Sequence, residues 1–408
     1  MRIILKIAWR NVWRNPRRSL VLITSIAVGV FGYLGTTAFS RGFLDQMIDS
    51  AINLHGGHIM VAAKGFNDNP NIRLFIREPG KVVAALKRIE GIDSAPLVSV
   101  AGMVSSSEGA AGVLINGVVP QRESRITVIS RSIIEGDYFL SGTGAAEIVI
   151  SRALAEKLNV TVGEKLVLMI SDLDNNISSG AYQVAGIYDV SSSDFEKANV
   201  YVTCEHAQAL AGYGDAVTAF SVKALDPRRV PKLKKQLGEA LAPERLEVLS
   251  WRDRNKLLDL ALRLYDFSLF VTILILFTAI AFSIANAFLM VIYERIHELG
   301  IMMANGVLPR KIRLMLYAES FFVTLLGLGL GFGISLAVLS YWSVNGLDLA
   351  DFASGLGTFG VGSVIYPSLA AFDIVLGVVV INLIILASVI YPSFKASRFE
   401  VVDAIRFV

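Results

Sequence analysis

Four long apolar blocks constrain this chain more than any other feature. A membrane-spanning helix needs about 20 mainly apolar residues, and four blocks reach that length: Leu20–Phe39, Phe267–Ile292, Leu316–Trp342 and Ala371–Ile390. None contains Lys or Arg, and their acids, Glu319 and Asp373, lie near the starts of the last two. Charged residues make up 18% of the chain, below the roughly 25% usual in soluble domains. The sequence therefore predicts an α-helical membrane protein with four transmembrane helices.

The first block has a second interpretation, a cleaved signal peptide, because Ala38-Phe39-Ser40 loosely resembles a cleavage site. The apolar region of a signal peptide is about 7–15 residues long. This block is longer, glycines interrupt it, and three more blocks follow. We therefore expect a retained anchor.

Basic residues near the blocks indicate the orientation, because cytoplasmic loops are enriched in Lys and Arg. They occur before the first block, between the second and third, and after the fourth: Arg2, Lys6, Arg10, Arg14, Arg17, Arg18; Arg295, Arg310, Lys311, Arg313; Lys395, Arg398, Arg406. The loop 343–370 contains two Asp and no Lys or Arg. We expect both termini in the cytoplasm, and we expect residues 40–266 and this loop outside it. The net charge of +3 gives no support to a nucleic-acid partner.

The N-terminal residues 3–14 have the pattern of an interfacial helix. An apolar stripe with two tryptophans, Ile4, Ile7, Ala8, Trp9 and Trp13, lies beside a basic one, as expected of a helix lying on a membrane. Pro16 is expected to end this helix. A plain stop-transfer charge cluster would explain the charges but not the two tryptophans.

The long segment between the first two blocks predicts one large or two small inserted domains of the α+β class. Residues 58–63, 97–105, 112–118, 147–150, 165–170, 182–188 and 246–249 are typical of strands, and 199–203 is strand-like. Residues 81–89, 152–158 and 231–241 favour helices, and 253–265 favours a helix that continues into the second block. Helices between some strands and hairpin-length gaps between others indicate α+β rather than a doubly wound parallel sheet. The predicted divisions are 1–19, 20–40, 41–252, 253–293, 294–312, 313–342, 343–370, 371–391 and 392–408.

Catalytic signatures are missing from the sequence. No G-x-x-x-x-G-K-[ST] phosphate loop occurs, Ile301 replaces the second His of an H-E-x-x-H motif after His297, and the serine-rich stretches lack the glycines of a nucleophile elbow. His55-Gly56-Gly57-His58 could supply two metal ligands, but without a third nearby a turn into a strand is favoured. The single cysteine, Cys204, is interpreted as a small core residue. We expect no enzyme and no cofactor bound by this chain.

Four motifs, in order along nearly the whole chain, carry a family resemblance. They are the opening Ala8-Trp9-Arg10-Asn11 through Arg17-Arg18, the run Leu154 to Glu164, the stretch Tyr293-Glu294-Arg295-Ile296-His297-Glu298-Leu299-Gly300 through Gly306, and the ending Tyr391-Pro392 through Asp403-Ala404-Ile405-Arg406. Together they resemble the FtsX/MacB/LolE-like permeases of ABC transporters. Gly57-His58-Ile59-Met60-Val61 and Asp68-Asn69-Pro70 resemble the lipoprotein-releasing LolC/LolE branch. Met303 departs from the family, which often has a basic residue there, and Asn305 stands where Leu is common.

The resemblance implies a multi-pass permease of the bacterial inner membrane with a periplasmic MacB-type domain. Its implied partners are two copies of a cytoplasmic ATPase, which would bind the ATP and Mg, a second permease copy or paralogue, membrane lipid, and lipoprotein or another hydrophobic cargo. Closure of the ATPase would move the outer domain. The alternative is a regulator of an envelope enzyme such as a peptidoglycan hydrolase.

Two sets of candidate site residues follow. The helix 294–304 ends near Gly306 and Pro309 and is suited to helix-in-groove docking, and the predicted ATPase-docking residues are Glu294, Arg295, Glu298, Gly300, Met303, Ala304 and Gly306. A transporter should also have an apolar lateral cavity between the first two spans, lined by Phe31, Leu34, Phe267, Phe270 and Leu274. A regulator would instead need an exposed patch on the inserted domain.

Polar and small residues within the blocks allow further expectations. Glu319 lies within about two turns of Arg313 and can snorkel to the interface, which favours a structural salt bridge over a proton relay. Asn286 and Asn382 are also costly at membrane depth. Glycines in the first and third blocks allow close helix contacts. The sequence does not decide between a dimer face and a contact within the chain.

Overall fold

The computed structural model describes residues 2–139, 146–190, 192–244, 246–358 and 360–396. The chain forms two compact units. The membrane unit comprises Met1–Leu44, Arg263–Asp348 and Val364–Val408, and the inserted domain comprises Asp45–Leu262 and Leu349–Ser363. The motif residues 397–398 and 403–406 lie outside the described residues.

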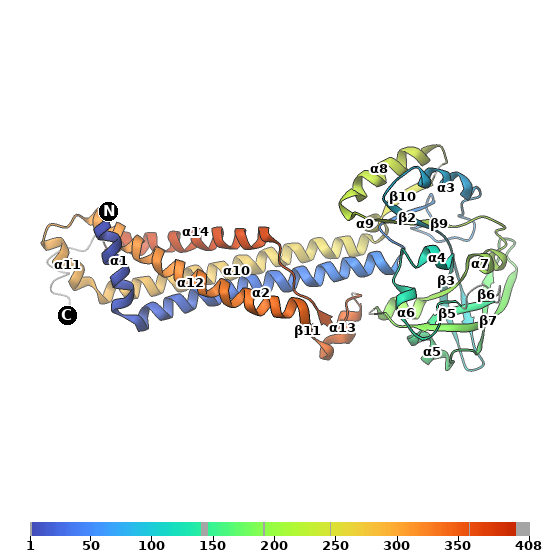
Figure 1. Cartoon of the computed structure of the whole chain (residues 1–408), viewed down its shortest axis with the longest axis horizontal. Coiled ribbons are helices and arrows are strands. Elements are labelled where there is room, and N and C mark those ends of the chain that lie inside the picture. Colours follow the sequence, from blue (N-terminus) through green and yellow to red (C-terminus); the bar gives the residue numbers. More distant parts are fainter. Residues whose placement is uncertain (1, 140–145, 191, 245, 359, 397–408) are drawn as a thin grey trace. The chain divides into compact units, whose positions relative to one another are not determined.

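Four long helices lie side by side in the membrane unit (Figure 1). They are α2 (Pro16–Leu54), α10 (Lys256–Glu294), α12 (Pro309–Asn345) and α14 (Ala371–Ala396). Within the described residues, these are the four helices long and apolar enough to cross a membrane. Helix α2 continues without a break through residues 38–40. The prediction of four membrane helices is therefore confirmed.

Glycines determine how closely these helices pack. A Cβ on Gly331 of α12 would lie 2.8 Å from Val30 Cβ and 2.9 Å from Ala27 Cα of α2. Gly327 meets α2 in the same way, whereas nothing lies within 4 Å of a Cβ on Gly329. One glycine face of α12 is therefore a contact within the chain, where the missing side chains let two backbones approach. The surrounding core is aliphatic and aromatic, with Ile26, Leu34, Ile284, Phe288, Val323, Ile381 and Ile385 fully or almost fully buried.

A two-stranded antiparallel pair and a short helix lie between α12 and α14. Strands β11 (Leu347–Asp348) and β12 (Val364–Ile365) pair antiparallel in the membrane unit, and α13 (Ala353–Thr358) belongs to the inserted domain. At the start of α14, Asp373 accepts a hydrogen bond from the Ala370 backbone and forms an ion pair with Arg41 at 2.9 Å. The acid of the fourth block thus caps its own helix and binds α2.

The inserted domain is built on one mixed sheet. Its ten strands within the described residues are β1 (Ile59–Ala63), β2 (Ile92–Ser105), β3 (Ala110–Val118), β4 (Ile133–Gly136), β5 (Glu147–Ser151), β6 (Lys165–Ser171), β7 (Ile177–Tyr188), β8 (Asn199–Thr203), β9 (Ala219–Ala224) and β10 (Leu246–Ser250). Nine follow the order β10-β1-β9-β2-β3-β8-β5-β7-β4, and β6 pairs with β2 and β7. Only β3–β8 and β5–β7 are parallel among these pairs. The α+β prediction is confirmed.

Alternating side chains give the sheet two faces. On one face, helices α3 (Pro79–Lys87), α5 (Arg152–Leu158), α7 (Cys204–Ala211) and α8 (Val230–Leu241) pack over Val200, Val202 and the main core. On the other, Tyr201 and Val149 pack with Leu54 and Phe195, near α4 (Pro120–Glu123) and α6 (Ser193–Ala198). Cys204 is buried, and burial raises the pKa of its thiol to about 11. This environment matches a core cysteine.

Several predicted elements differ in their bounds. Strands β2 and β7 are longer than expected, and β4 and β9 were not predicted. Strand β4 has only four residues and lies between Ser132 and Asp137. The expected helix 253–265 is interrupted at Asn255. A capping box of Ser250 and Asp253 starts the short helix α9 (Trp251–Arg254), and α10 begins after Asn255. Reciprocal capping satisfies the free N–H groups of a new helix start, so a separate short helix forms here.

Candidate functional site

A short helix, α11 (Ile296–Ala304), lies between α10 and α12 at one end of the membrane unit (Figure 1). Helix α10 ends at Glu294, and Arg295 has a non-helical backbone with φ −115° and ψ 14°. At the other end Gly306 has φ +82°, a conformation that glycine adopts easily, and Pro309 begins α12. The predicted helix 294–304 is thus two elements with a break at Arg295.

The two faces of α11 have different surroundings. Ile296, Leu299 and Gly300 are buried, and Met303 packs beside them against Ile312, Met315 and Leu316 of α12. His297, Ile301 and Ala304 are exposed. Positions i, i+3, i+4 and i+7 share one side of a helix, so residues 296, 299, 300 and 303 anchor α11, and residues 297, 301 and 304 form its exposed face. We call these three residues the outer face of α11.

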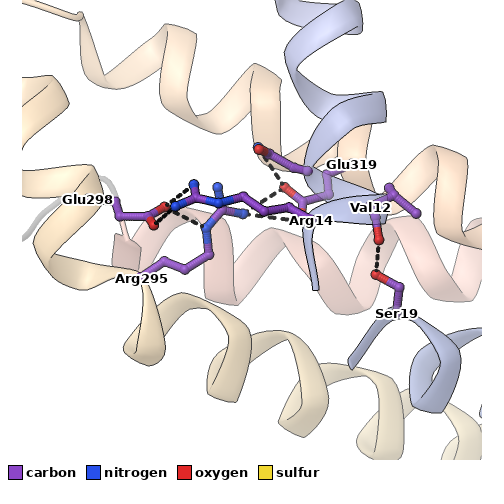
Figure 2. Close-up of polar contacts among 7 residues, drawn as sticks. Val12, Arg14, Ser19, Arg295, Glu298 and Glu319 are labelled. Atoms are coloured by element: carbon purple, nitrogen blue, oxygen red, sulfur yellow. Dashed lines mark hydrogen bonds and ion pairs between the residues drawn. The ribbon is translucent and has the colours of Figure 1, made fainter. Parts of the chain in front are cut away.

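Charged residues join α11 to two other helices (Figure 2). The guanidinium of Arg295 donates to both carboxylate oxygens of Glu319 on α12, at 3.1 and 3.2 Å. Its Nε donates to Glu298 at 3.2 Å. Glu298 also forms an ion pair at 2.8 Å with Arg14 of α1 (Arg2–Arg14). We call Arg14, Arg295, Glu298 and Glu319 the charge cluster.

Burial separates a strong pair from a weak one in this cluster. The side chains of Arg295 and Glu319 are each 11% exposed, and breaking a buried ion pair costs about 3–5 kcal/mol. Arg14 and Glu298 are 63% and 39% exposed, and such exposed pairs contribute about 0–1 kcal/mol. Arg295 and Glu319 therefore fix the start of α11, while Arg14 and Glu298 form a contact that is easily broken.

Helix α1 lies against α12 through a small apolar face. Ala8 and Val12 are fully buried, Trp9 packs edge-on against Phe322 of α12 at 5.2 Å, and Asn11 donates to Glu319 at 3.5 Å. Ile3, Ile7 and Trp13 stay exposed. One side of α1 therefore faces α12 and the other is exposed.

The turn from α1 to α2 is short and hydrogen-bonded. The Ser19 hydroxyl donates to the Val12 carbonyl at 2.5 Å (Figure 2). The Ser19 backbone donates to the Asn15 carbonyl at 3.2 Å. Pro16 is the first residue of α2, where its missing N–H costs nothing. These contacts limit the orientations that α1 can take relative to α2.

The seven predicted docking residues do not share one surface. Arg295 and Glu298 belong to the charge cluster, Gly300 is buried and Met303 half-buried, while Glu294, Ala304 and Gly306 are exposed. Sequence reasoning missed His297 and Ile301 of the outer face, and it missed Asn11 and Arg14 as partners. Helical spacing on α11 could have revealed the first two.

The charge on Glu319 is paired, as expected of a structural salt bridge, but with Arg295. Arg313, the basic residue near it in sequence, instead places its guanidinium over the ring of Phe394 at 4.6 Å. Arg295 is 24 residues away along the chain. The bend between α10 and α12 brings it to Glu319.

The five predicted cavity residues are not brought together in the single chain. Leu34 is fully buried in the membrane core and Phe31 is half-buried. Phe267, Phe270 and Leu274 are each more than half exposed along one side of α10. The exposed three could line a surface shared with another molecule, whereas Leu34 packs inside this one.

The histidine pair in the inserted domain forms a turn. Gly56 and Gly57, both with positive φ, connect α2 to β1, and the ring of His58 accepts a hydrogen bond from Ala224. Burial, and then the charge of Arg254, lowers the pKa of His55 to about 4. In the part of the chain that the structure describes, no three His, Cys, Asp or Glu side chains are grouped to hold a metal.

Comparison with known proteins places these features in a family. Models of the MacB-like periplasmic core domain and of the FtsX-like permease C-terminal domain match residues 19–240 and 269–401. The lipoprotein-releasing system transmembrane protein LolC of Neisseria meningitidis serogroup B is 23% identical over 410 residues, covering 95% of this chain and 94% of that protein. LolC of Xylella fastidiosa is 22% identical over 402 residues, with the same coverage.

A solved structure resembles the inserted domain. The periplasmic region of MacB from Actinobacillus actinomycetemcomitans has 13% sequence identity and a TM-score of 0.37, and the match covers 51% of this chain and 94% of that one.

Proposed function

The chain belongs to the FtsX- and MacB-like permeases of ABC transporters, and on this premise we propose that it is the membrane subunit of an ATP-driven machine that releases lipoproteins or another hydrophobic envelope substrate. Both termini and α11 would lie in the cytoplasm, and the inserted domain in the periplasm. ATP and Mg would be bound by a separate ATPase. The relatives named for lipoprotein release support the substrate class.

The charge cluster is the observation that carries this proposal. A helix that receives force from an ATPase must be tied to the helices that it moves. Arg295 joins α11 to α12 through a buried pair, and Glu298 joins it to α1 through an exposed one. A push on α11 would therefore reach α12 directly, and it would reach α1 through a contact that can open.

The outer face of α11 is the proposed docking surface for the ATPase. Ile301 is 43% exposed between His297 and Ala304, which places one apolar side chain at the centre of a small helical face. A helix of this kind binds in a groove through residues at i, i+4 and i+7. Four of the seven predicted docking residues would hold the helix in place rather than touch the partner: Arg295, Glu298, Gly300 and Met303.

The exposed side of α10 is the proposed surface for a second permease copy or paralogue and for cargo. Phe267, Phe270 and Leu274 lie at helical spacing on it. Two such sides facing each other would form an apolar space open to lipid. Relative to water, acyl chains of a lipoprotein would be stabilised there by about 0.8 kcal/mol per CH₂ group.

Affinity purification in a mild detergent, with mass spectrometry of bound proteins and lipids, tests the proposal. We expect an ABC ATPase together with lipoproteins. Ile301→Glu should abolish recovery of the ATPase, and Glu298→Lys should weaken it by disturbing the charge cluster. Ile177→Glu, the same change at an exposed isoleucine of the inserted domain, is the matched control and should retain the ATPase.

The outcomes separate the candidate functions. An ATPase recovered with a cell-wall hydrolase and no lipidated cargo would replace lipoprotein release by regulation of an envelope enzyme. If no ATPase is recovered with the wild-type protein, the proposal that the outer face of α11 binds an ATPase is contradicted.

A further inference from the structure

A cavity of about 170 Å³ lies inside the inserted domain, on the sheet face opposite the main core. Met60, Ser221 and Ala95 are neighbours in register across β1, β9 and β2 and line it on one side. Leu54, Phe66 and Phe195 line it from outside the sheet. A cavity of about 150 Å³ can bind benzene, so this one has room for a small organic group.

A row of polar side chains crosses the sheet at this cavity. Ser99 donates to Asn116, Asn116 donates to Asn199, and Asn199 donates to the Phe195 carbonyl, at 2.9–3.0 Å each. All three side chains are buried. The row satisfies its own hydrogen bonds, and it gives one wall of an otherwise apolar cavity a polar surface.

Arg254, the last residue of α9, brings a positive charge to this cavity. Its side chain is half-buried at the cavity, and desolvation lowers the pKa of Arg254 to about 10. The side chain makes no hydrogen bond or ion pair with any residue in the described part of the chain. Desolvating a charge without a partner is costly, so Arg254 is an uncompensated cation.

The acid that lines the same cavity does not neutralise this charge. Glu123 accepts hydrogen bonds from the Thr127 hydroxyl on one carboxylate oxygen and from the Tyr138 hydroxyl on the other. Burial raises the pKa of Glu123. Its carboxyl group is therefore held by neutral donors, and Arg254 keeps its donors free.

Gly56 leaves space next to the guanidinium. A Cβ on Gly56 would lie 4.0 Å from Arg254 Nη1 and 2.5 Å from the Ser221 hydroxyl oxygen. Gly56 has φ +83°, where a side chain is strained. The Ser221 hydroxyl likewise has no partner among the described residues. Two free donors thus face one small space that a side chain would fill.

We propose that this cavity binds a phosphate or carboxylate group carried on a small apolar body, with Arg254 and Ser221 holding the anion and the aliphatic and aromatic wall holding the rest. Guanidinium binds such oxyanions through charge-assisted hydrogen bonds, which are stronger than neutral ones. The apolar wall would exclude a bare, fully hydrated ion. The anion can belong to a free phosphate ester or to the headgroup of a lipid.

Thermal unfolding of the full-length protein in a nonionic detergent tests this site. Phenyl phosphate should raise the unfolding midpoint of the wild-type protein with increasing concentration, as binding to the folded state requires. Dihexanoyl phosphatidate, added separately, tells a lipid headgroup from a soluble ester. Arg254→Met should weaken the apparent affinity by about tenfold or more, because one charged contact is lost.

Arg252→Gln is the matched control. Arg252 lies two residues away on the same short helix, with its guanidinium 5.1 Å from the centre of the Trp251 ring and its side chain 60% exposed. This variant should bind the probes like the wild type. Arg254→Met should also unfold at a higher midpoint without any probe, because an uncompensated charge has been removed.

Three results would overturn the proposal. One is a wild-type midpoint that neither organic probe changes, and another is an equal response in Arg254→Met. The third is an Arg254→Met protein that unfolds at a lower midpoint than the wild type without a probe, since the arginine would then support the fold. If inorganic phosphate raises the unfolding midpoint as much as phenyl phosphate does, the apolar wall does not contribute to binding and that part of the proposal is contradicted.

Discussion

The two units of this permease bury charge in opposite ways. In the membrane unit, Arg295 and Glu319 are both almost fully buried and lie against each other. In the inserted domain, Arg254 is half-buried without a counter-charge and Glu123 is held by neutral hydroxyls. Buried charge therefore serves two purposes in this protein. A paired charge holds helices together, whereas an unpaired one is retained at a cost in stability, which is typical of binding sites.

The largest expected effect comes from breaking the buried pair of the membrane unit. Glu319→Leu leaves Arg295 buried without its main partner, which should destabilise the protein by about 3–5 kcal/mol. Chemical denaturation of the full-length protein in detergent measures the loss. A loss below about 1 kcal/mol would show that the pair is hydrated and that the comparison with Arg254 fails.

The double variant Arg295→Met with Glu319→Leu is the control for this prediction. It removes both charges at once, and replacing a buried pair by apolar side chains is often neutral or stabilising. We expect it to recover most of the loss seen with Glu319→Leu alone. Equal losses in both proteins would place the effect in packing rather than in charge.

A second prediction concerns a buried acid of the inserted domain. Burial raises the pKa of Glu196 to about 7 from its ordinary 4.5, helped by the nearby Asp189, whose carboxylate is already paired with Arg152 at 2.5 Å. The folded state therefore binds a proton more tightly than the unfolded state. The stability that this proton provides is fully present below about pH 4.5 and is lost as the pH rises through about 7.

Glu196→Gln should remove this dependence. Relative to the wild type, the unfolding midpoint of the inserted domain in the variant should be higher at pH 8 than at pH 5 by a few degrees. In a domain of about 150–250 residues, the size range of the inserted domain, 1 kcal/mol corresponds to about 2–4 °C. Asp194→Asn, at an exposed position of the same helix, is the control. A constant difference across this pH range would contradict the prediction.

The smallest effect is expected at the exposed pair of the charge cluster. Arg14→Gln removes the contact with Glu298 and should cost about 0.2–1 kcal/mol. High salt should reduce the difference from the wild type, because exposed charges are screened. A loss as large as that of Glu319→Leu would mean that the Arg14–Glu298 contact is not the one that opens easily.

The elements with strong local patterns could be predicted from the sequence. The four apolar blocks, the long alternating strands and the amphipathic α8 all carry signals within 20 or so residues. Strand β4, with four residues, does not, because it depends on its neighbours in the sheet. The capping box that starts α9 was visible at Ser250 and Asp253, but the apolar pattern of the following helix concealed the break at Asn255.

The position of the candidate site in the chain could be predicted from the sequence, but the contacts among its residues could not. The order of the motifs along the chain pointed to residues 294–306. Helical periodicity alone could have separated the buried Gly300 from the exposed Ile301. The partners of these residues lie far away along the chain: Arg14 and Glu298 are 284 residues apart, and Arg254 approaches the turn at Gly56. No local pattern encodes such contacts, because they arise only when the helices and the sheet have packed.

A photocrosslinking amino acid in place of Ile301 tests the central claim most directly. The claim is that the outer face of α11 docks an ABC ATPase. Irradiation of cells carrying this variant should give a crosslinked product that contains the ATPase, and the same amino acid in place of Ile177 should not. No ATPase product from position 301, or an equal yield from position 177, would contradict the account.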